Sequence, residues 1–521
     1  MKARVISALL TFLVLTLLGC SNEANNESKS SNENGRQEKI KDNLQYAINA
    51  QPPTIDPHMT TSSTTRDVAI HIFETLVTLN SKFEVVPMLA ESWEIGEDGK
   101  TYIFHLREGI MFHNGKEMTA DDVVASMVRW LEKTKVAPLE GAVFKAKDAN
   151  TVELSVKEPS LFILPSLTPT IQIPGIMPKE VIEAASESGV EEYIGTGPFK
   201  FIDWKQDQYI HLAKFEDYKL VETAPDGLGG KREALVENLY FQIVIDPSTR
   251  LAGLQSGQYD VGYAYEPDTV GMLESNPNIN VYAPVFGYTN IIFNKNEGMM
   301  TNLKMRQAVN AALNMEAIAK NSLVDNYRIY SSIMVKEQDN WYSDAGSEFY
   351  NQNDPEKSKK LLAEAGYDGE TIRLLTTREF SYMYNSSVVI KEQLEKAGIN
   401  VEVEVYDWPT TLTRRNDPTK WELFVSGFPT SATPIEQLHY IPGYIDGPED
   451  EKTEELLQQI RSASSQEEAS KLWNELQGYS WEYLPIIKIA DYTLPSAATD
   501  KVTGLTFFST GPVLWNTQVV E

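Results

Sequence analysis

Residues 89–130 read LAESWEIGEDGKTYIFHLREGIMFHNGKEMTADDVVASMVRW, and this stretch decides the fold. Between residues 101 and 106 apolar and polar side chains alternate, which is the pattern of a strand with one buried face. Thr119 precedes Asp121 and Asp122, and we expect it to be a helix N-cap because a helix dipole favours negative charge in the first turn. The stretch therefore predicts strands, turns and a helix of a rigid supporting lobe, without residues typical of a reaction.

The same stretch resembles the signature region of the family 5 extracytoplasmic solute-binding proteins, which are peptide- and nickel-binding receptors of ABC importers. The resemblance covers residues 44–515 and implies an α/β fold of the type II (cluster C) periplasmic-binding-protein class. In that class two α/β lobes are joined by a hinge, and family 5 adds a small domain. The shared elements are LAESW at 89–93, DGK-Y-F-LR-G--FH-G at 98–115, T-DDV--S at 119–126 and GTGPF at 195–199.

The length of the chain agrees with several lobes. A chain of 521 residues is too long for one ordinary hydrophobic core, and 42% hydrophobic and 10% aromatic residues are enough to form large cores. Strands near Tyr288 and Ile489 are expected to join the two lobes as a hinge. We predict lobe I from residues 41–80, 195–285 and 489–521, an additional domain from 81–194, and lobe II from 286–488.

The N-terminus has the pattern of a secretory signal peptide over residues 1–19. Lys2 and Arg4 are followed by an apolar run that is shorter than the ~20 residues needed to cross a bilayer. Leu17-Leu18-Gly19-Cys20 resembles a bacterial lipobox, which implies cleavage before Cys20 and a lipid on its sulfur. Residues 20–40 contain almost no side chain able to bury surface, so we expect a disordered, lipid-anchored tether. The protein is expected on the outer face of the bacterial cell membrane, in the periplasm if the cell is Gram-negative.

Composition excludes several other classes of function. A net charge of −28 argues against nucleic acid and anionic membrane surfaces as binding partners. Cys20 is the one cysteine of the sequence, so no intrachain disulfide or cysteine metal cluster is expected. The six histidines show no metal-ligand spacing such as HExxH, and no G-x-S-x-G elbow occurs. We therefore expect no catalytic residues, no metal site, no cofactor and no enzymatic activity.

Candidate ligand-binding residues lie on loops that follow strands. In the dipeptide-binding branch of the family an arginine in the loop after a strand pairs with the ligand carboxylate, and Arg378 is the match, although it could also be a surface arginine. Such a pair is favourable because a guanidinium can bind a carboxylate through two hydrogen bonds. Aromatic residues are typical of ligand chambers, but they are equally typical of ordinary cores. The further candidates are Tyr288, Tyr382, Trp408 and Phe428 as walls, and Thr60 in the polar loop where the family lines its chamber.

One departure from the family pattern concerns the ligand. Peptide receptors of this family carry an aspartate in a GW--D--DP arrangement, which binds the peptide ammonium group. Residues 427–434 read GFPTSATP and contain no acid. A buried ammonium without a partner would cost several kcal/mol. Either another acid such as Glu379 or Glu436 substitutes, or the ligand is not an ordinary peptide. The arginines that would hold the carboxylates of a nickel chelate also have no counterpart, because residues 164–177 contain no arginine.

We therefore expect an extracytoplasmic receptor that captures a small ligand by lobe closure and delivers it to the permease subunits of an ABC importer. A di- or oligopeptide is the expected ligand, and a nickel chelate, an opine-like conjugate or an oligosaccharide are alternatives of the same fold. An envelope hydrolase would need a nucleophile or metal set that the sequence lacks, and an adhesive lipoprotein would not need a hinge. The expected partners are the ligand, the permease and, through the lipid, the membrane; we expect no nucleic acid and a monomer.

Overall fold

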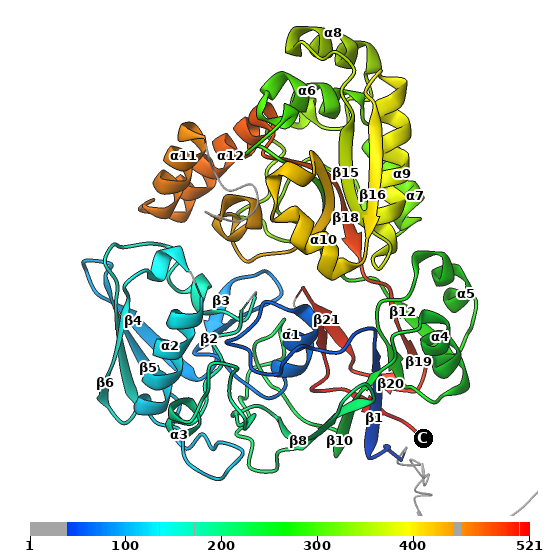
Figure 1. Ribbon diagram of the computed structural model, residues 1–521. Coiled ribbons are helices and arrows are strands. Elements are labelled where there is room, and N and C mark those ends of the chain that lie inside the picture. Colours follow the sequence, from blue (N-terminus) through cyan, green and yellow to red (C-terminus); the bar gives the residue numbers. More distant parts are fainter. Residues whose placement is uncertain (1–38, 135, 171, 442–449, 510) are drawn as a thin grey trace, which may run out of the picture. The chain divides into compact units, whose positions relative to one another are not determined.

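A computed structural model describes residues 39–134, 136–170, 172–441, 450–509 and 511–521. Residues 40–521 form one unit by their contacts. Three main sheets, of seven, six and four strands, organise this unit (Figure 1). Within the described ranges, no helix is both long and apolar enough to cross a bilayer.

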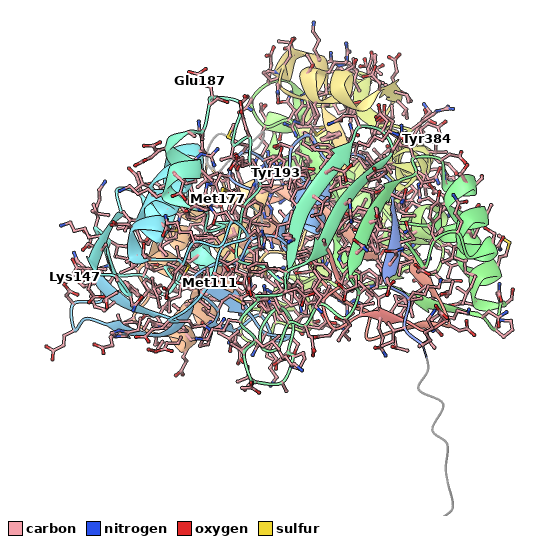
Figure 2. All side chains as sticks on the ribbon, turned by 90° about the horizontal axis from the view of Figure 1, so that it is seen from below. Met111, Lys147, Met177, Glu187, Tyr193 and Tyr384 are labelled. Atoms are coloured by element: carbon pink, nitrogen blue, oxygen red, sulfur yellow. The ribbon has the colours of Figure 1, made fainter. Side chains whose placement is uncertain are left out.

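The first sheet has seven strands and mixed direction. The strand β1 pairs in parallel with β10 and with β11, as the strand-helix-strand rhythm predicts, whereas β8, β9, β12 and β19 pair antiparallel to their neighbours. In Figure 2 the green strands of this sheet run side by side next to the blue β1. In spatial order the strands are β12 (Ile279–Tyr282), β19 (Ser496–Thr499), β11 (Val261–Gly262), β1 (Asn43–Ile48), β10 (Asn238–Ile243), β9 (Tyr209–Lys214) and β8 (Phe199–Lys205).

The second sheet has six strands and is accompanied by most of the long helices. Its strands in spatial order are β14 (Tyr327–Arg328), β18 (Ile486–Thr493), β13 (Val285–Phe293), β17 (Leu423–Pro429), β15 (Ile372–Thr377) and β16 (Val401–Tyr406). The helices of this part are α6 (Leu303–Ala312), α7 (Met315–Leu323), α8 (Pro355–Ala365), α9 (Ser381–Lys396), α10 (Trp408–Arg415), α11 (Glu451–Arg461) and α12 (Gln466–Tyr483).

The chain passes between these two sheets at two places close to the predicted ones. The expected crossing strands near Tyr288 and Ile489 are β13 and β18, which pair with each other inside the second sheet. Residues 489–493, assigned to lobe I from the sequence, therefore belong to the second sheet, because the apolar strand continues to Thr493. The passages themselves lie at residues 283–284 and 494–495.

The additional domain is the part that the quoted stretch builds. Its four-stranded sheet contains β4 (Ala90–Ile95), β5 (Thr101–Leu106), β7 (Thr151–Ser155) and β6 (Val143–Asp148), and α2 (Ala120–Lys133) packs on it (Figure 1). The alternation predicted for β5 is confirmed, since Tyr102, Phe104 and Leu106 are buried. Thr119 caps α2 as predicted, and its amide donates to a carboxylate oxygen of Asp122 at 2.9 Å.

The helix α1 (Ser63–Ala69) is followed by a close approach of two backbone segments. The amide of Gly197 donates to the carbonyl oxygen of Ile72 at 2.9 Å. A Cβ atom at Gly197 would lie 2.5 Å from the carbonyl oxygen of His71. The GTGPF element therefore serves a tight entry into β8, as expected for its glycines.

Both ends of the helix α4 (Pro247–Ser256) are capped by the residues that flank it. Asp246 accepts a hydrogen bond from the Thr249 amide at 2.7 Å at the start of α4, and Gly257 ends that helix with a φ of 75°. The remaining short elements are β2 (Val77–Leu79), β3 (Val85–Pro87), α3 (Lys179–Glu183), α5 (Val270–Glu274), β20 (Val502–Thr503), β21 (Thr506–Phe508), β22 (Gly511–Val513) and β23 (Gln518–Val519).

Candidate ligand-binding site

A cavity of about 750 Å³ lies between the additional domain and the part of the chain built on the second sheet. We call it the chamber. Its size falls in the range of sites that hold small molecules. Three distant parts of the chain line it: the loop before α1, the end of α2 with the segments that follow, and the segment after β17. The lining residues are Thr61, Val128, Trp130–Glu132, Thr134, Val136, Pro138–Ala142, Ser166, Thr168, Thr170, Gln172, Ile435, Glu436, Leu438, Tyr440, Ile441 and Arg461.

The walls of the chamber are mainly apolar. Trp130, Leu139, Ile435 and Tyr440 are buried side chains that face it. The hydroxyl groups of Ser166, Thr168 and Thr170 and the side-chain amide of Gln172 supply polar edges. An apolar cavity with a few polar groups is the usual form of a small-ligand site, because apolar contacts give affinity and the polar groups fix orientation.

The charged side chains of the chamber differ in their exposure. Glu132 and Glu140 are exposed, whereas Glu436 is half-buried. One carboxylate oxygen of Glu436 accepts a hydrogen bond from the Thr433 amide at 3.0 Å. Burial raises the pKa of Glu436 to about 7, against the lowering effect of that hydrogen bond. Arg461 forms an ion pair with the exposed Glu454 at 3.3 Å.

A buried ion pair fixes two of the chamber walls relative to each other. Arg129 on α2 donates to both carboxylate oxygens of Asp56, at 3.2 and 2.6 Å. Burial alone would raise the pKa of Asp56, but the hydrogen bonds from Arg129 and the Val190 amide lower it overall. The amide of Gln172 also donates to the carbonyl oxygen of His58 at 2.5 Å. Thr61 follows this anchored loop, and Trp130 follows Arg129, so the pair positions both.

A second cavity of about 530 Å³ lies between the part of the chain built on the first sheet and the part built on the second. Its walls come from Phe83, Phe507 and Trp515 with their neighbours on one side, and from Val335, Glu337 and Thr430 on the other. Pro284, at one passage between the sheets, also lines it. This cavity lies beside the hinge and is smaller than the chamber.

Tyr288 and Phe428, two predicted wall residues, lie one layer behind the chamber. Both are 1% exposed and their rings meet edge to face with centroids 5.8 Å apart. The Tyr288 hydroxyl donates to the Gln437 side-chain oxygen at 2.9 Å, and the His439 ring stacks on Phe428. Burial lowers the pKa of His439 to about 3, so this ring is neutral. These residues support the 435–441 wall from the core of the second lobe.

The position at which the family pattern places an aspartate holds Ser431. Its hydroxyl donates to the carbonyl oxygen of Thr433 at 2.8 Å and accepts from the amide of Gln437 at 2.8 Å. The side-chain amide of Gln338 donates to the Ser431 carbonyl oxygen at 2.8 Å. This turn is thus held by neutral hydrogen bonds and brings no negative charge to the position of the missing acid.

Arg378 and Tyr382 point to different surroundings. Arg378 is exposed; its guanidinium lies 4.3 Å from the ring centre of Tyr384 and donates to that hydroxyl at 2.9 Å (Figure 2 labels Tyr384). The Tyr382 ring stacks on Tyr492 with centroids 5.2 Å apart and packs against Gly427. Burial raises the pKa of Tyr382. Neither residue lines the chamber.

The remaining predicted residues are only partly described. The Thr60 hydroxyl accepts a hydrogen bond from the Ser62 amide at 3.1 Å, and its neighbour Thr61 is the one that lines the chamber. Trp408 is the first residue of α10, and its side chain lies outside the described part of the structure. Cys20, the signal peptide and the tether up to residue 38 also lie outside it.

Several chamber residues carry no local sequence pattern that marks them as lining residues. We expected the quoted stretch to be a supporting lobe only, yet Trp130 at its end is a chamber wall. The segment 166–172 was noted for its prolines and missing arginines, and not as a wall. In the described ranges, no group of three His, Cys, Asp or Glu side chains is placed to bind a metal ion.

Comparison with known proteins decides the family. The model of bacterial extracellular solute-binding proteins, family 5 (middle region), matches residues 84–441. The chain belongs to this family. A probable peptide ABC transporter periplasmic-binding protein of Sinorhizobium fredii, y4tO, is 28% identical to this family 5 protein over 89% of this chain and 91% of its own.

Solved structures show the same fold. DppA from Helicobacter pylori, solved with the peptide STSA, has a TM-score of 0.77 and 24% identity, over 92% of this chain and 99% of its own. AgaA from A. tumefaciens R10, solved with agropinic acid, has the same TM-score, identity and coverage. The expected two-lobed type II fold of this family 5 protein is confirmed, and its family consists of solute-binding proteins.

Proposed function

We propose that this family 5 protein is the substrate-binding receptor of an ABC importer and that its ligand is a di- or oligopeptide. The chamber is the observation that carries the proposal, because it is an apolar cavity of about 750 Å³ lined by three segments that meet only in the folded protein. The name of the S. fredii relative, a probable peptide-binding component of an ABC transporter, supports the same function.

Entry of the ligand requires the lobes to separate. The Ser381 hydroxyl donates to a carboxylate oxygen of Glu266 at 2.8 Å, which joins the second lobe to the first. The Ser160 hydroxyl donates to the carbonyl oxygen of Arg461 at 2.8 Å, which joins the additional domain to the second lobe beside the chamber. Opening breaks such single, exchangeable hydrogen bonds, and ligand contacts across the chamber favour the closed form.

The finer parts of the proposal concern the anchor and the ligand carboxylate. The lipobox-like sequence that ends at Cys20 supports a lipid anchor on the outer face of the cell membrane, with a monomeric body that meets the permease. Arg378 is proposed to hold a ligand carboxylate, since its side chain is exposed and its guanidinium contacts Tyr384 by stacking and by one hydrogen bond.

The proposal is tested by asking what the protein carries and what it binds. The domain from residue 40 to 521 is purified, and native mass spectrometry identifies any mass that dissociates on denaturation. Isothermal titration calorimetry is then performed on the unfolded and refolded protein with a pool of di- to tetrapeptides. Micromolar or tighter binding supports the proposal; absence of binding to every pool member overturns the peptide assignment.

One observation favours a second ligand class. Residues 427–434 contain no acid, and Ser431 occupies the position of the usual ammonium partner. An opine-like conjugate has no free peptide ammonium terminus that needs an acidic partner, and AgaA was solved with agropinic acid. A competition titration with the peptide pool and an opine distinguishes these two ligand classes. The class that is the true ligand displaces the weaker competitor from the chamber, and the weaker competitor does not displace it.

A further inference from the structure

The loop that follows β7 in the additional domain places one aromatic side chain in the core of the second lobe. Phe162 is 1% exposed and belongs to a cluster of buried side chains whose other described members all lie between residues 288 and 486. Its ring stacks on that of Trp341, with an interplanar angle of 25° and centroids 5.7 Å apart. An apolar side chain of the additional domain therefore packs inside a different lobe.

The next residue of the same loop is buried in its own domain. Ile163 is 0% exposed and belongs to the core of the additional domain. The Tyr102 hydroxyl of β5 donates to the Ser160 carbonyl oxygen at 3.3 Å, which fixes the start of the loop to the domain's sheet. Adjacent side chains thus belong to two different cores, and the loop is held by the additional domain while Phe162 reaches across.

The additional domain is joined firmly to the first lobe. The buried pair of Arg129 with Asp56 connects the two, and the His113 ring donates to the carbonyl oxygen of Gly197 at 3.0 Å. Towards the second lobe, the polar contact of the loop is the single hydrogen bond from the Ser160 hydroxyl to the end of α11. We therefore expect the additional domain to move with the first lobe when the lobes separate, so that opening withdraws Phe162 from the second lobe.

We infer that Phe162 is a latch that holds the protein in its closed form before any ligand binds. Opening exposes the Phe162 ring and its contact face on Trp341 to water. Burial of one phenylalanine side chain favours the closed form by about 10- to 100-fold in the ratio of closed to open molecules. The inference rests on the lobe opening proposed above, and it does not depend on which ligand the chamber takes.

The latch is connected to the chamber through the backbone. The Ser166 amide donates to the Phe162 carbonyl oxygen at 3.0 Å, and Ser166 lines the chamber. On the opposite side, Arg461 lines the chamber and its carbonyl oxygen accepts the hydrogen bond from Ser160. Withdrawal of Phe162 therefore separates two chamber walls. A ligand that contacts both walls acts on the same equilibrium as the latch and adds to it.

The test measures the distance between the additional domain and the second lobe without a ligand. Cys20 is the one cysteine of the sequence, so the 40–521 protein accepts two spin labels at chosen positions. Glu97→Cys in the turn before β5 and Lys360→Cys on α8 are both exposed sites. The protein is unfolded and refolded to remove any bound ligand, and pulsed electron paramagnetic resonance gives the distance distribution. Small-angle scattering of the unlabelled protein measures its compactness.

The expected result is one dominant short distance in wild type and a second, longer distance in Phe162→Ala, with a ratio of closed to open molecules that is lower by about 10- to 100-fold. Trp341→Ala should act in the same direction, and the double variant should add little, because each single variant removes the same contact. The control is Phe201→Ala, which truncates a half-buried phenylalanine that packs on Tyr193 within the first lobe and should keep the wild-type distribution.

Each contrary outcome overturns the latch. Phe162→Ala with the wild-type distribution, an equal shift in Phe201→Ala, or a wild type that is mainly open without ligand would each show that the ring does not hold the lobes together. If a thermal melt shows that Phe162→Ala is unfolded, Trp341→Ala decides from the other side of the contact, and an unchanged distribution there refutes the inference. The calorimetric titration with peptides is a separate measurement, so failure of the peptide assignment would leave these distances unchanged.

Discussion

The guanidinium of Arg129 and the carboxylate of Asp56 form two hydrogen bonds, at 3.2 and 2.6 Å, and both side chains are removed from water. This pair connects α2 of the additional domain to the loop before α1. Because Trp130 and Thr61 line the chamber and lie next to these two anchored segments, the pair determines the distance between two of its walls.

Asp56→Ala is expected to destabilise the protein by about 3–5 kcal/mol, because it leaves the Arg129 charge buried without a partner. The double variant Asp56→Ala/Arg129→Met should recover part of that loss. Urea unfolding monitored by tryptophan fluorescence measures both. An Asp56→Ala effect below about 1 kcal/mol would contradict the assigned importance of the pair.

The pH dependence of the same pair has a definite sign. The pKa of Asp56 is lowered in the folded protein, so its contribution is complete above the unfolded value of about 4 and is lost as the pH falls through the folded value. Unfolding at pH 7 and at pH 3 should therefore show a smaller penalty for Asp56→Ala at the lower pH. An equal penalty at the two values would argue against an ionised pair.

Asp67 on α1 should have the opposite pH dependence. Its carboxylate is 1% exposed, neither oxygen has a hydrogen-bond partner among the described residues, and burial raises its pKa to about 7 despite the nearby Arg66. The folded protein holds this proton more tightly than the unfolded chain. The stability contributed by the protonated form is present below about pH 4 and is lost as the pH rises to 7, a change of roughly 4 kcal/mol.

Asp67→Asn keeps the shape of the side chain and removes its charge, so it should be more stable than wild type at pH 8 and similar at pH 4. Urea unfolding of both proteins at pH 4.5, 6 and 8 checks this. The neighbouring Asp67 contact with Gly511 is preserved in the variant, since asparagine has the same size. Parallel pH profiles for the two proteins would refute the assignment.

The local parts of the fold were predictable because the residues that cause them are adjacent in the sequence. Thr119 and Asp122 form the cap of α2 within one turn, and Asp246 with Gly257 marks both ends of α4. The alternation at 101–106 predicts which side chains of β5 are buried.

The chamber was not predictable in the same way. Its walls at Thr61, Trp130 and Ile435 come from three segments that no local pattern connects. Aromatic residues such as Tyr288 and Phe428 were chosen from the resemblance, and they lie in the core behind the wall. Hydrophobic periodicity distinguishes buried from exposed positions, but it does not distinguish a core contact from a ligand contact. The resemblance gave the family, but it did not identify which side chains line the chamber.

Gly197→Ala should destabilise the protein by about 2–4 kcal/mol. The new Cβ would lie 2.5 Å from the His71 carbonyl oxygen and 2.8 Å from that of Ile72, and backbone atoms cannot move aside as a flexible side chain would. Gly271→Ala is the matched control, because it lies in α5 and nothing is within 4 Å of its new Cβ. Thermal melts that shift equally for the two variants would contradict this explanation of the GTGPF element.

The proposed role of Arg378 predicts a selective loss of ligand affinity. Arg378→Ala should weaken binding of peptides with a free carboxylate by about 10-fold or more, since a charge-assisted pair is lost, and should leave stability nearly unchanged because the side chain is exposed. Peptide amides, which lack the carboxylate, should bind wild type and variant alike.

The control for this prediction is an arginine outside the chamber lining. Arg328→Ala is unsuitable, because Arg328 is paired with Glu337 and with the buried Asp491. Arg415→Ala is preferable. Calorimetry with one peptide and its amide decides the matter: if the variant binds the free acid as tightly as wild type does, Arg378 is not part of the site, and Arg461 in the chamber becomes the residue to test for the carboxylate.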